Sequence, residues 1–243
     1  MAKTGLSVAD EIIQDLVVGN KILYHQKVVD GFGHISVRHD KDPSRYLMSR
    51  HLAPGLVTAD DIVTFDLDSN PVDKTGLRYY SERFIHGEIY KIRPDVKAVV
   101  HCHAPQLIPF GATKYPLRPI YHMSGFLGCG GCGVPIFEIR ETGGMTDMLI
   151  RTPELGKALA ASLEDRPIVL MRGHGATIVG DSIRQVVYRS VYAAQNAALQ
   201  MDAIKLGEPI YLEPEEAEKA SEANDRVVDR PWALWRCEAI DES

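Results

Sequence analysis

The sequence predicts an α/β protein, because stretches with helical periodicity alternate with short runs of β-branched residues bounded by Gly, Pro or Asp. Its 243 residues are enough for one substantial core, so we expect a single domain over residues 1–243. Hydrophobic residues make up 45% of the chain and charged residues 25%, which are ordinary values for a globular protein.

Composition also limits the classes of partner. No apolar run approaches the roughly 20 residues that span a bilayer, and the N-terminus lacks the layout of a signal peptide, so we expect a cytoplasmic protein. A net charge of −6 argues against nucleic acid or membrane as partner and favours a small-molecule substrate. Four cysteines are too few for a disulfide framework, and the CxxC spacing of Cys129 and Cys132 lacks a second pair of ligands.

The first 66 residues read as a helix followed by strands. Ser7 is a candidate N-cap of an amphipathic helix, in which Gly19-Asn20 marks a candidate break. Two alternating segments then flank turn-forming residues and predict a hairpin. The expected elements are a helix over 7–29 and strands over 34–38, 46–49 and 62–66.

A second helix is expected from Glu82 to about Arg93, with Ser81 as its N-cap and Pro94 as its stop. Its expected buried stripe consists of Ile85, Ile89 and Ile92. Glu82 shares this inward face at the helix N-terminus, where an inward carboxylate needs a partner. The alternative is an ordinary first-turn Glu stabilised by the helix dipole and solvent.

Residues 96–103 read as a strand bounded by Pro94 and Pro105. Strand alternation places His101 and His103 on the same face, where two neutral imidazoles can chelate one metal ion. A pair of hydrogen-bonded histidines without a metal is the alternative. A third histidine, His174, has glycine on both sides, which suits a residue presented into a site.

The remainder alternates strands and helices around a segment rich in Pro, Gly and aromatic residues. In that segment Tyr121 and His122 belong to a cluster typical of clefts. Trp232 and Trp235 predict that the tail over 209–243 docks on the core or on a neighbouring subunit. The expected elements are strands over 134–137, 168–171 and 176–179 and helices over 152–163 and 182–207.

Several motifs, in this order over about residues 7–207, resemble the class II aldolase and adducin head-domain family. They are GFGHIS (31–36), SE (81–82), RPD (93–95) followed by VVHCHA (99–104), and RGHG (172–175). The resemblance implies a three-layer α/β/α sandwich around a mostly antiparallel sheet, built into a homotetramer with active sites at subunit interfaces. It also implies one divalent metal ion per subunit on His101, His103 and His174, with Glu82 as further ligand and acid/base. The ligand types suit Mn or Zn and also allow Fe or Co.

The departures from the family's sugar-phosphate aldolases concern the phosphate pocket and the proton donor. Where those enzymes hold phosphate with Asn, a Thr/Gly loop and a Ser-Ser pair, this sequence has His34, Ser49-Arg50-His51 and Tyr80-Ser81. Their neighbouring-subunit tyrosine aligns with His122, beside Tyr121. Arg50 and His34 suit a carboxylate, and Tyr80 suits a flat ring.

These departures favour the family's decarboxylase branch, of the vitamin B6 degradation type. Such an enzyme removes a carboxylate ortho to a ring hydroxyl from a hydroxyaromatic or hydroxypyridine acid. Glu82 or His122 would then protonate the ring carbon. The alternatives are an aldolase or epimerase acting on a small hydroxy-ketone or sugar phosphate and, more remotely, a non-catalytic adducin-like interaction module.

Overall fold

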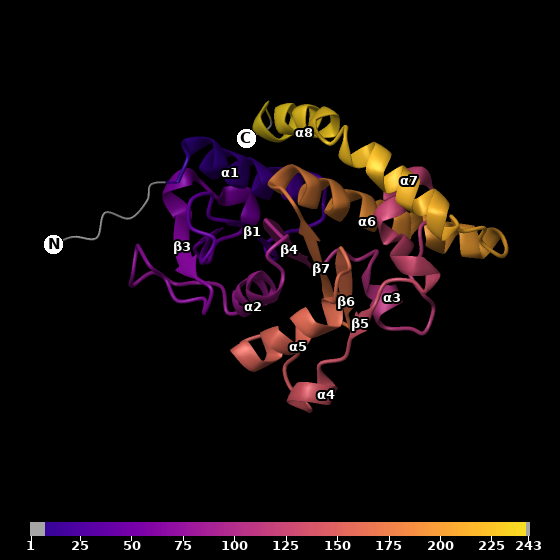
Figure 1. The fold of residues 1–243 in the computed structure, drawn as a ribbon, viewed down its shortest axis with the longest axis horizontal. Coiled ribbons are helices and arrows are strands. Elements are labelled where there is room, and N and C mark those ends of the chain that lie inside the picture. Colours follow the sequence, from indigo (N-terminus) through magenta and orange to yellow (C-terminus); the bar gives the residue numbers. More distant parts are fainter. Residues whose placement is uncertain (1–7, 242–243) are drawn as a thin grey trace.

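The computed structural model describes residues 8–241 and contains a seven-stranded sheet in the order β3-β2-β1-β4-β7-β6-β5 (Figure 1). All neighbouring strands are antiparallel except β5 and β6, which are parallel. The strands are β1 (His34–Arg38), β2 (Arg45–Ser49), β3 (Ile62–Asp66), β4 (Ala98–Cys102), β5 (Ile136–Phe137), β6 (Ile168–Met171) and β7 (Gly175–Gly180).

Helices cover both faces of the sheet, which confirms the predicted three-layer α/β/α sandwich (Figure 1). Residues of α1 (Asp10–His25), α6 (Ile183–Leu206) and α8 (Asp229–Asp241) share one core with one face of the sheet. Residues of α2 (Phe84–Ile92) and α5 (Pro153–Leu163) share a second core with the other face. The remaining elements are η1 (Pro54–Leu56), η2 (Ala59–Asp61), α3 (Ile108–Gly111), η3 (His122–Gly131), α4 (Arg140–Gly143) and α7 (Pro214–Asp225).

The predicted hairpin is confirmed, and two of the helices begin at capping side chains. Strands β1 and β2 pair in antiparallel register, with Val37 opposite Leu47. The Thr152 side chain accepts from the first turn of α5, and the Ser182 hydroxyl accepts from the Gln185 N–H of α6 at 3.2 Å. Local capping chemistry therefore sets where these two helices begin.

The expected break in the first helix is wrong, because α1 continues through Gly19 and Asn20. A Cβ on Gly19 would lie 3.2 Å from Ile183, so the glycine allows α1 and α6 to approach closely. The Asn20 side chain donates to the Leu16 carbonyl at 2.9 Å within the helix. The expected N-cap Ser7 lies outside the described residues.

The second helix begins later than expected, at Phe84 with Arg83 as N-cap, so Ser81 is not the cap but an exposed turn residue. Ile85 and Ile89 are fully buried, as predicted. Ile92 is 50% exposed, because it is the last residue of α2 and neither core packs over it. The following strand is also shorter than expected and leaves His103 just beyond the end of β4.

The tail forms two helices that the sequence analysis did not anticipate. Helix α8 packs against α1 and α6, and Trp232 and Trp235 are buried in their core. Helix α7 packs against η3. Within the described part of the chain, no helix combines the length and the apolar character needed to cross a membrane.

Candidate active site

Four candidate metal ligands lie close together where β4 ends and β7 begins, in the middle of the sheet. His101 lies in β4 and His103 directly follows it, while His174 lies in the turn between β6 and β7. Glu82 comes from the turn that precedes α2. One ligand atom from each of these four residues lies within 4.8 Å of the others.

The spacing of these atoms fits a single divalent ion. The Nε2 atom of His103 lies 3.0 Å from Nε2 of His101 and 3.1 Å from Nε2 of His174. Oε2 of Glu82 lies 3.6 Å from Nε2 of His101 and 3.7 Å from Nε2 of His174. Tetrahedral ligands about 2.1 Å from one zinc ion would be about 3.4 Å apart. The described side chains therefore form a site with the donor set and dimensions that such an ion requires.

The surroundings favour the protonation states that metal ligands need. Burial lowers the pKa of His174 to about 4 and also lowers the pKa values of His101 and His103. All three imidazoles are therefore neutral at pH 7, and each can offer a nitrogen lone pair to a metal ion. Burial raises the pKa of Glu82 to about 7, although the Ile150 backbone N–H and Arg151 favour the carboxylate. A bound cation would favour the carboxylate further.

Backbone features hold the cluster in place. The Ile150 N–H donates to Oε1 of Glu82 at 2.9 Å, which leaves Oε2 toward the histidines. A Cβ on Gly175 would clash with the Cys102 carbonyl oxygen, so only glycine lets β7 start this close to β4. Gly173 has φ +61°, which permits the tight turn that carries His174. The close approach of β7 to β4 and the tight turn thus explain why glycine stands on both sides of His174.

A family model for the class II aldolase and adducin N-terminal domain matches residues 14–201. The chain belongs to this family. Decarboxylase tropJ of Talaromyces stipitatus is 38% identical over 244 residues, covering 92% of each chain. A 3,4-dihydroxyphthalate decarboxylase of Arthrobacter keyseri is 31% identical over 199 residues, 77% of this chain and 76% of the relative. These relatives make the chain a carbon–carbon lyase, as predicted.

A solved structure supports the fold independently. L-fuculose 1-phosphate aldolase from Glaciozyma antarctica superposes with a TM-score of 0.78 at 19% identity, covering 100% of this chain and 96% of the aldolase. At this identity the similarity concerns the fold alone, and it confirms the class II aldolase architecture predicted for this member of the family.

The predicted substrate-binding residue His34 lies beside the ligand candidate His101, and Tyr80 lies beside His34. The His34 ring centroid is 5.1 Å from that of His101 and 4.7 Å from that of Tyr80. The Tyr80 hydroxyl donates to the Leu52 carbonyl and lies 3.2 Å from the buried Ser49 hydroxyl. These contacts orient the Tyr80 ring. Ser49 supports that ring, whereas Ser81 is exposed.

The structure gives Arg50 a partner within the chain. Its Nε donates to Oδ1 of Asp61 at 2.7 Å, and the Arg50 side chain remains 40% exposed. Asp61 also accepts from the Thr58 backbone and hydroxyl, which closes a capping box at η2. Part of the positive charge of Arg50 is therefore compensated before any substrate binds.

Tyr121 and His122 lie at the start of η3, which packs against α6 and α7. The Tyr121 hydroxyl donates to Gln195 of α6 at 3.4 Å, and the His122 carbonyl accepts from Asn224 of α7 at 2.7 Å. Among the described residues, no hydrogen bond, ion pair or ring contact joins either residue to the ligand cluster.

The sequence analysis missed the polar residues that support His34. His86 contacts His34, and Ser36 and Tyr90 continue the same buried hydrogen-bond chain. The spacing contained a signal, since residues two apart share a strand face and residues four apart share a helix face. His34 and Ser36 have the first spacing, and His86 and Tyr90 have the second.

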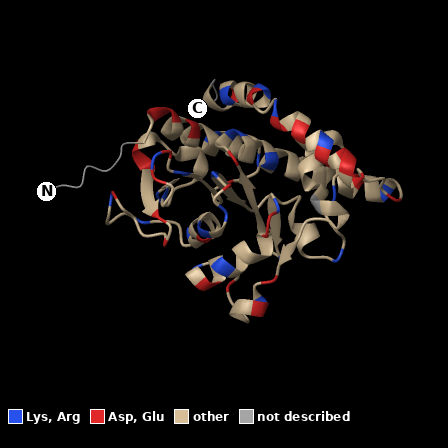
Figure 2. Ribbon diagram, in the orientation of Figure 1, with Lys and Arg blue, Asp and Glu red and all other residues tan. Residues whose placement is uncertain are grey.

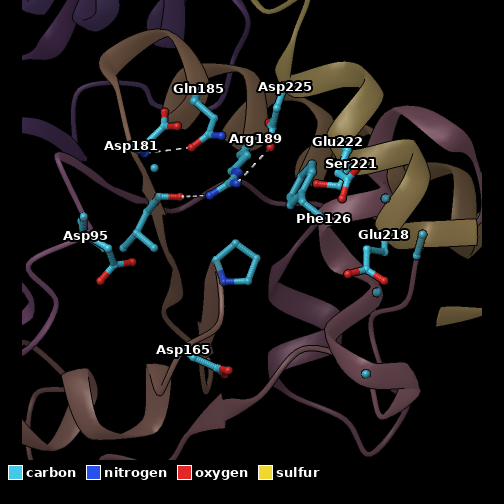
Figure 3. A pocket seen from close by; sticks show the side chains of 18 of the residues that line it. Asp95, Phe126, Asp165, Asp181, Gln185, Arg189, Glu218, Ser221, Glu222 and Asp225 are labelled. Atoms are coloured by element: carbon cyan, nitrogen blue, oxygen red, sulfur yellow. Dashed lines mark hydrogen bonds and ion pairs between the residues drawn. The ribbon is translucent and has the colours of Figure 1, made fainter. Parts of the chain in front are cut away.

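A cavity of about 950 Å³ lies in a different place (Figure 3). It adjoins the start of β4 and the end of β7, whereas the four ligands lie at the opposite ends of these strands. Acidic residues line it, several of them on α7, where Figure 2 shows a concentration of Asp and Glu. None of the four candidate ligands contributes to its lining.

Proposed function

We propose that the chain is a metal-dependent decarboxylase. It would remove a carboxylate ortho to a ring hydroxyl from a hydroxyaromatic or hydroxypyridine mono- or dicarboxylate. The observation that carries this proposal is the Glu82, His101, His103 and His174 cluster beside the rings of His34 and Tyr80. The decarboxylase names of the relatives support the same chemistry.

The four clustered residues would hold one divalent ion per subunit, with Mn or Zn as first candidates and Fe or Co also suited to this donor set. When bound, the ion supplies Lewis-acid stabilisation of negative charge on the substrate. The remaining steps belong to side chains of this chain. Glu82 or His122 would deliver a proton to the ring carbon as the bond to the departing carboxylate breaks and its electron pair enters the ring.

The proposed substrate class has a recognisable pattern. The Arthrobacter relative is named for 3,4-dihydroxyphthalate, in which a hydroxyl and two carboxylates occupy consecutive ring carbons. The hydroxypyridine 3-hydroxy-2-methylpyridine-4,5-dicarboxylate of vitamin B6 degradation has the same arrangement. We propose that the middle carboxylate leaves. Tyr80 would face the ring, and Arg50 or His34 would anchor the carboxylate that stays.

We further propose a homotetramer in which Tyr121 and His122 of one subunit complete the site of its neighbour. Their position at the start of η3, apart from the cluster of their own subunit, supports this arrangement. The domain spanning residues 1–243 would be the repeating unit, with a small molecule as its substrate.

Aldol or epimerase chemistry is the second candidate, because the same metal cluster serves it and an L-fuculose 1-phosphate aldolase shares the fold. The positions expected to hold phosphate carry His34, Arg50 and Tyr80, which argues against a sugar phosphate. A non-catalytic adducin-like module has no need for a complete ligand cluster, since function resides in the site and not in the fold.

The deciding experiment combines elemental analysis of the purified protein with an assay of carbon dioxide release. The metal-replete enzyme is offered 3,4-dihydroxyphthalate, 3-hydroxy-2-methylpyridine-4,5-dicarboxylate and L-fuculose 1-phosphate. We expect about one metal ion per chain and carbon dioxide release from at least one of the two acids.

Each other outcome selects an alternative. Cleavage of the sugar phosphate without carbon dioxide release from either acid would favour the aldolase. Absence of metal uptake together with absence of turnover would favour the interaction module.

A further inference from the structure

A buried chain of hydrogen bonds leads from the candidate site into the sheet. Nδ1 of His34 lies 2.7 Å from Nε2 of His86, and Nδ1 of His86 lies 2.6 Å from Oγ of Ser36. Oγ of Ser36 in turn lies 2.8 Å from the hydroxyl oxygen of Tyr90. This row of hydrogen bonds connects β1 with α2. His34 and Ser36 share one face of the strand, and His86 and Tyr90 lie one helical turn apart on the helix.

These four groups exchange hydrogen bonds as neutral partners. All of them are at least 96% buried, with exposed fractions of 4% for His34, 1% for Tyr90 and 0% for Ser36 and His86. Burial lowers the pKa of His86 to about 3 and raises the pKa of Tyr90 well above its usual value. A neutral imidazole carries a single proton, so each ring in the chain donates through one nitrogen and accepts through the other.

The Tyr90 end determines the direction of donation. The hydroxyl oxygens of Tyr90 and Ser36 lie 2.8 Å apart and either is able to donate, whereas the Lys97 carbonyl lies 3.5 Å from the Tyr90 hydroxyl, at the limit of a hydrogen bond. The shorter contact is the stronger one, which assigns the Tyr90 proton to Ser36. The Arg38 guanidinium stands 4.7 Å over the Tyr90 ring, and this positive charge strengthens the phenol as a donor. With this assignment, Ser36 donates to Nδ1 of His86, and Nε2–H of His86 donates to Nδ1 of His34.

We propose that His86, Ser36 and Tyr90 are positioning residues that hold His34 in its Nε2–H form, as a neutral donor to an anionic oxygen of the substrate. Nε2 of His34 has no hydrogen-bond partner among the described residues, and its ring lies next to the metal-ligand candidate His101. The opposite tautomer would present a lone pair to the anion and repel it. Arg50 already donates from Nε to Asp61, whereas Nε2 of His34 is uncommitted within the described part of the chain, on the ring that lies against His101. This inference rests on the proposed function for its acidic substrate.

The test compares two substitutions of His86. In His86→Gln the amide nitrogen occupies the place of Nε2 and still donates to His34, whereas His86→Leu removes the donor at similar volume. Ile89→Val, on the same buried helix, is the matched control. The readouts are the KM and kcat for the acid substrate, and nitrogen NMR of ¹⁵N-histidine-labelled metal-replete protein, with the His34 signal assigned through His34→Gln.

We expect the His34 proton on Nε2 in the wild type, in His86→Gln and in Ile89→Val, and a mixture of the two tautomers in His86→Leu, because no group then donates to Nδ1 of His34. The KM should rise about 10-fold to 100-fold in His86→Leu, because a hydrogen bond to a charged group is lost. It should change only slightly in His86→Gln, with kcat less affected than KM throughout. If His86→Leu does not fold, Ser36→Ala takes its place and should give a mixture of His34 tautomers with a smaller rise in KM.

A wild-type His34 protonated on Nδ1 would overturn the inference, as would a KM that is unchanged in a folded variant whose His34 tautomer has changed. Failure of the proposed function is distinguishable from both. The wild type would then release no carbon dioxide from either acid, while the NMR of the same samples would still show the predicted change of tautomer and support the positioning role.

Discussion

The two faces of strands β1 and β4 differ in chemistry, although their residues alternate along the same backbone. Toward α1 and α6, Ile35 and Val37 of β1 and Val100 of β4 join an apolar core. Toward α2, the alternate positions of β1 are His34, Ser36 and Arg38, all buried, and β4 contributes His101. The face toward α1 and α6 stabilises the sheet through apolar packing, whereas part of the face toward α2 consists of polar side chains.

This difference has a physical cost that the structure meets with hydrogen bonds. Buried polar groups destabilise a fold unless they find partners. Arg38 donates to the carbonyls of Val96, Pro43, Tyr90 and Arg93. The row of hydrogen bonds from His34 to Tyr90 supplies partners for the buried polar atoms within it. The comparison therefore predicts that substitutions on the α2 face affect function first, and those on the α1 and α6 face affect stability first.

The largest effect is expected for His101→Ala, which should lose measurable carbon dioxide release and weaken metal binding by more than about 100-fold. The adjacent Cys102 lies in the opposite core, so Cys102→Ala is the matched control and should retain metal and activity. Elemental analysis and the carbon dioxide assay measure both variants. Retention of a full metal complement by His101→Ala would contradict the ligand assignment.

A large loss of stability without loss of metal is expected for Ile178→Ala. Ile178 is fully buried in β7 opposite Val100, on the α1 and α6 face. Removing its side chain should lower the free energy of unfolding by about 2–5 kcal/mol, because the cavity cannot fully collapse. Urea unfolding measures the change. A variant of normal stability that fails to bind metal would break the distinction between the faces.

Mixed oligomers test whether the α2 face is completed by a neighbouring subunit. Glu82→Gln should be nearly inactive alone because it alters a candidate metal ligand, and His122→Ala should be nearly inactive if His122 delivers the proton. After joint unfolding and refolding in equal amounts, about one quarter of the sites should combine an intact Glu82 with an intact neighbouring His122. Recovery of activity near that level supports the interfacial site. If mass spectrometry shows that mixed oligomers have formed but no activity returns, both residues belong to the site of one subunit or lie outside the site.

The smallest effect concerns Asp61, which pairs with Arg50. Burial by itself would raise the pKa of Asp61, but hydrogen bonds from Thr58 and Arg50 outweigh it and hold this pKa below its ordinary value. Ionised Asp61 therefore stabilises the fold above pH of about 4, and this contribution is lost as the pH falls through its lowered pKa.

Asp61→Asn should consequently lower the free energy of unfolding by about 1 kcal/mol at pH 7, with the difference from wild type shrinking toward pH 3. Urea unfolding across this pH range measures it, with the exposed Asp60→Asn as control. The same variant tests substrate binding, because Arg50 without its partner should bind a carboxylate more tightly and lower the KM. An unchanged KM would indicate that Arg50 serves the fold alone.

Local patterns in the sequence determined much of the candidate site. Alternation in a short strand is enough to place His101 and His103 on one face. Glu82 was expected inward on a helix, but it reaches the site from the turn before α2, where the Ile150 N–H holds its carboxylate. The glycines around His174 indicated a residue presented by a turn. The wrong predictions occurred where local rules compete with packing. At Gly19, contact with α6 keeps the helix continuous, and at Ile92 no other element packs over the end of α2.

Only the tertiary structure decided which groups meet across long separations in the chain. His34 and His86 are 52 residues apart, and whether their rings touch depends on how α2 crosses β1, which no local periodicity specifies. The pairing of Arg50 with Asp61 and the distance of His122 from its own cluster have the same origin. The sequence determines which face of each element a side chain occupies. The packing of those faces decides its partners, because contact between distant segments depends on the arrangement of the whole sheet and its helices.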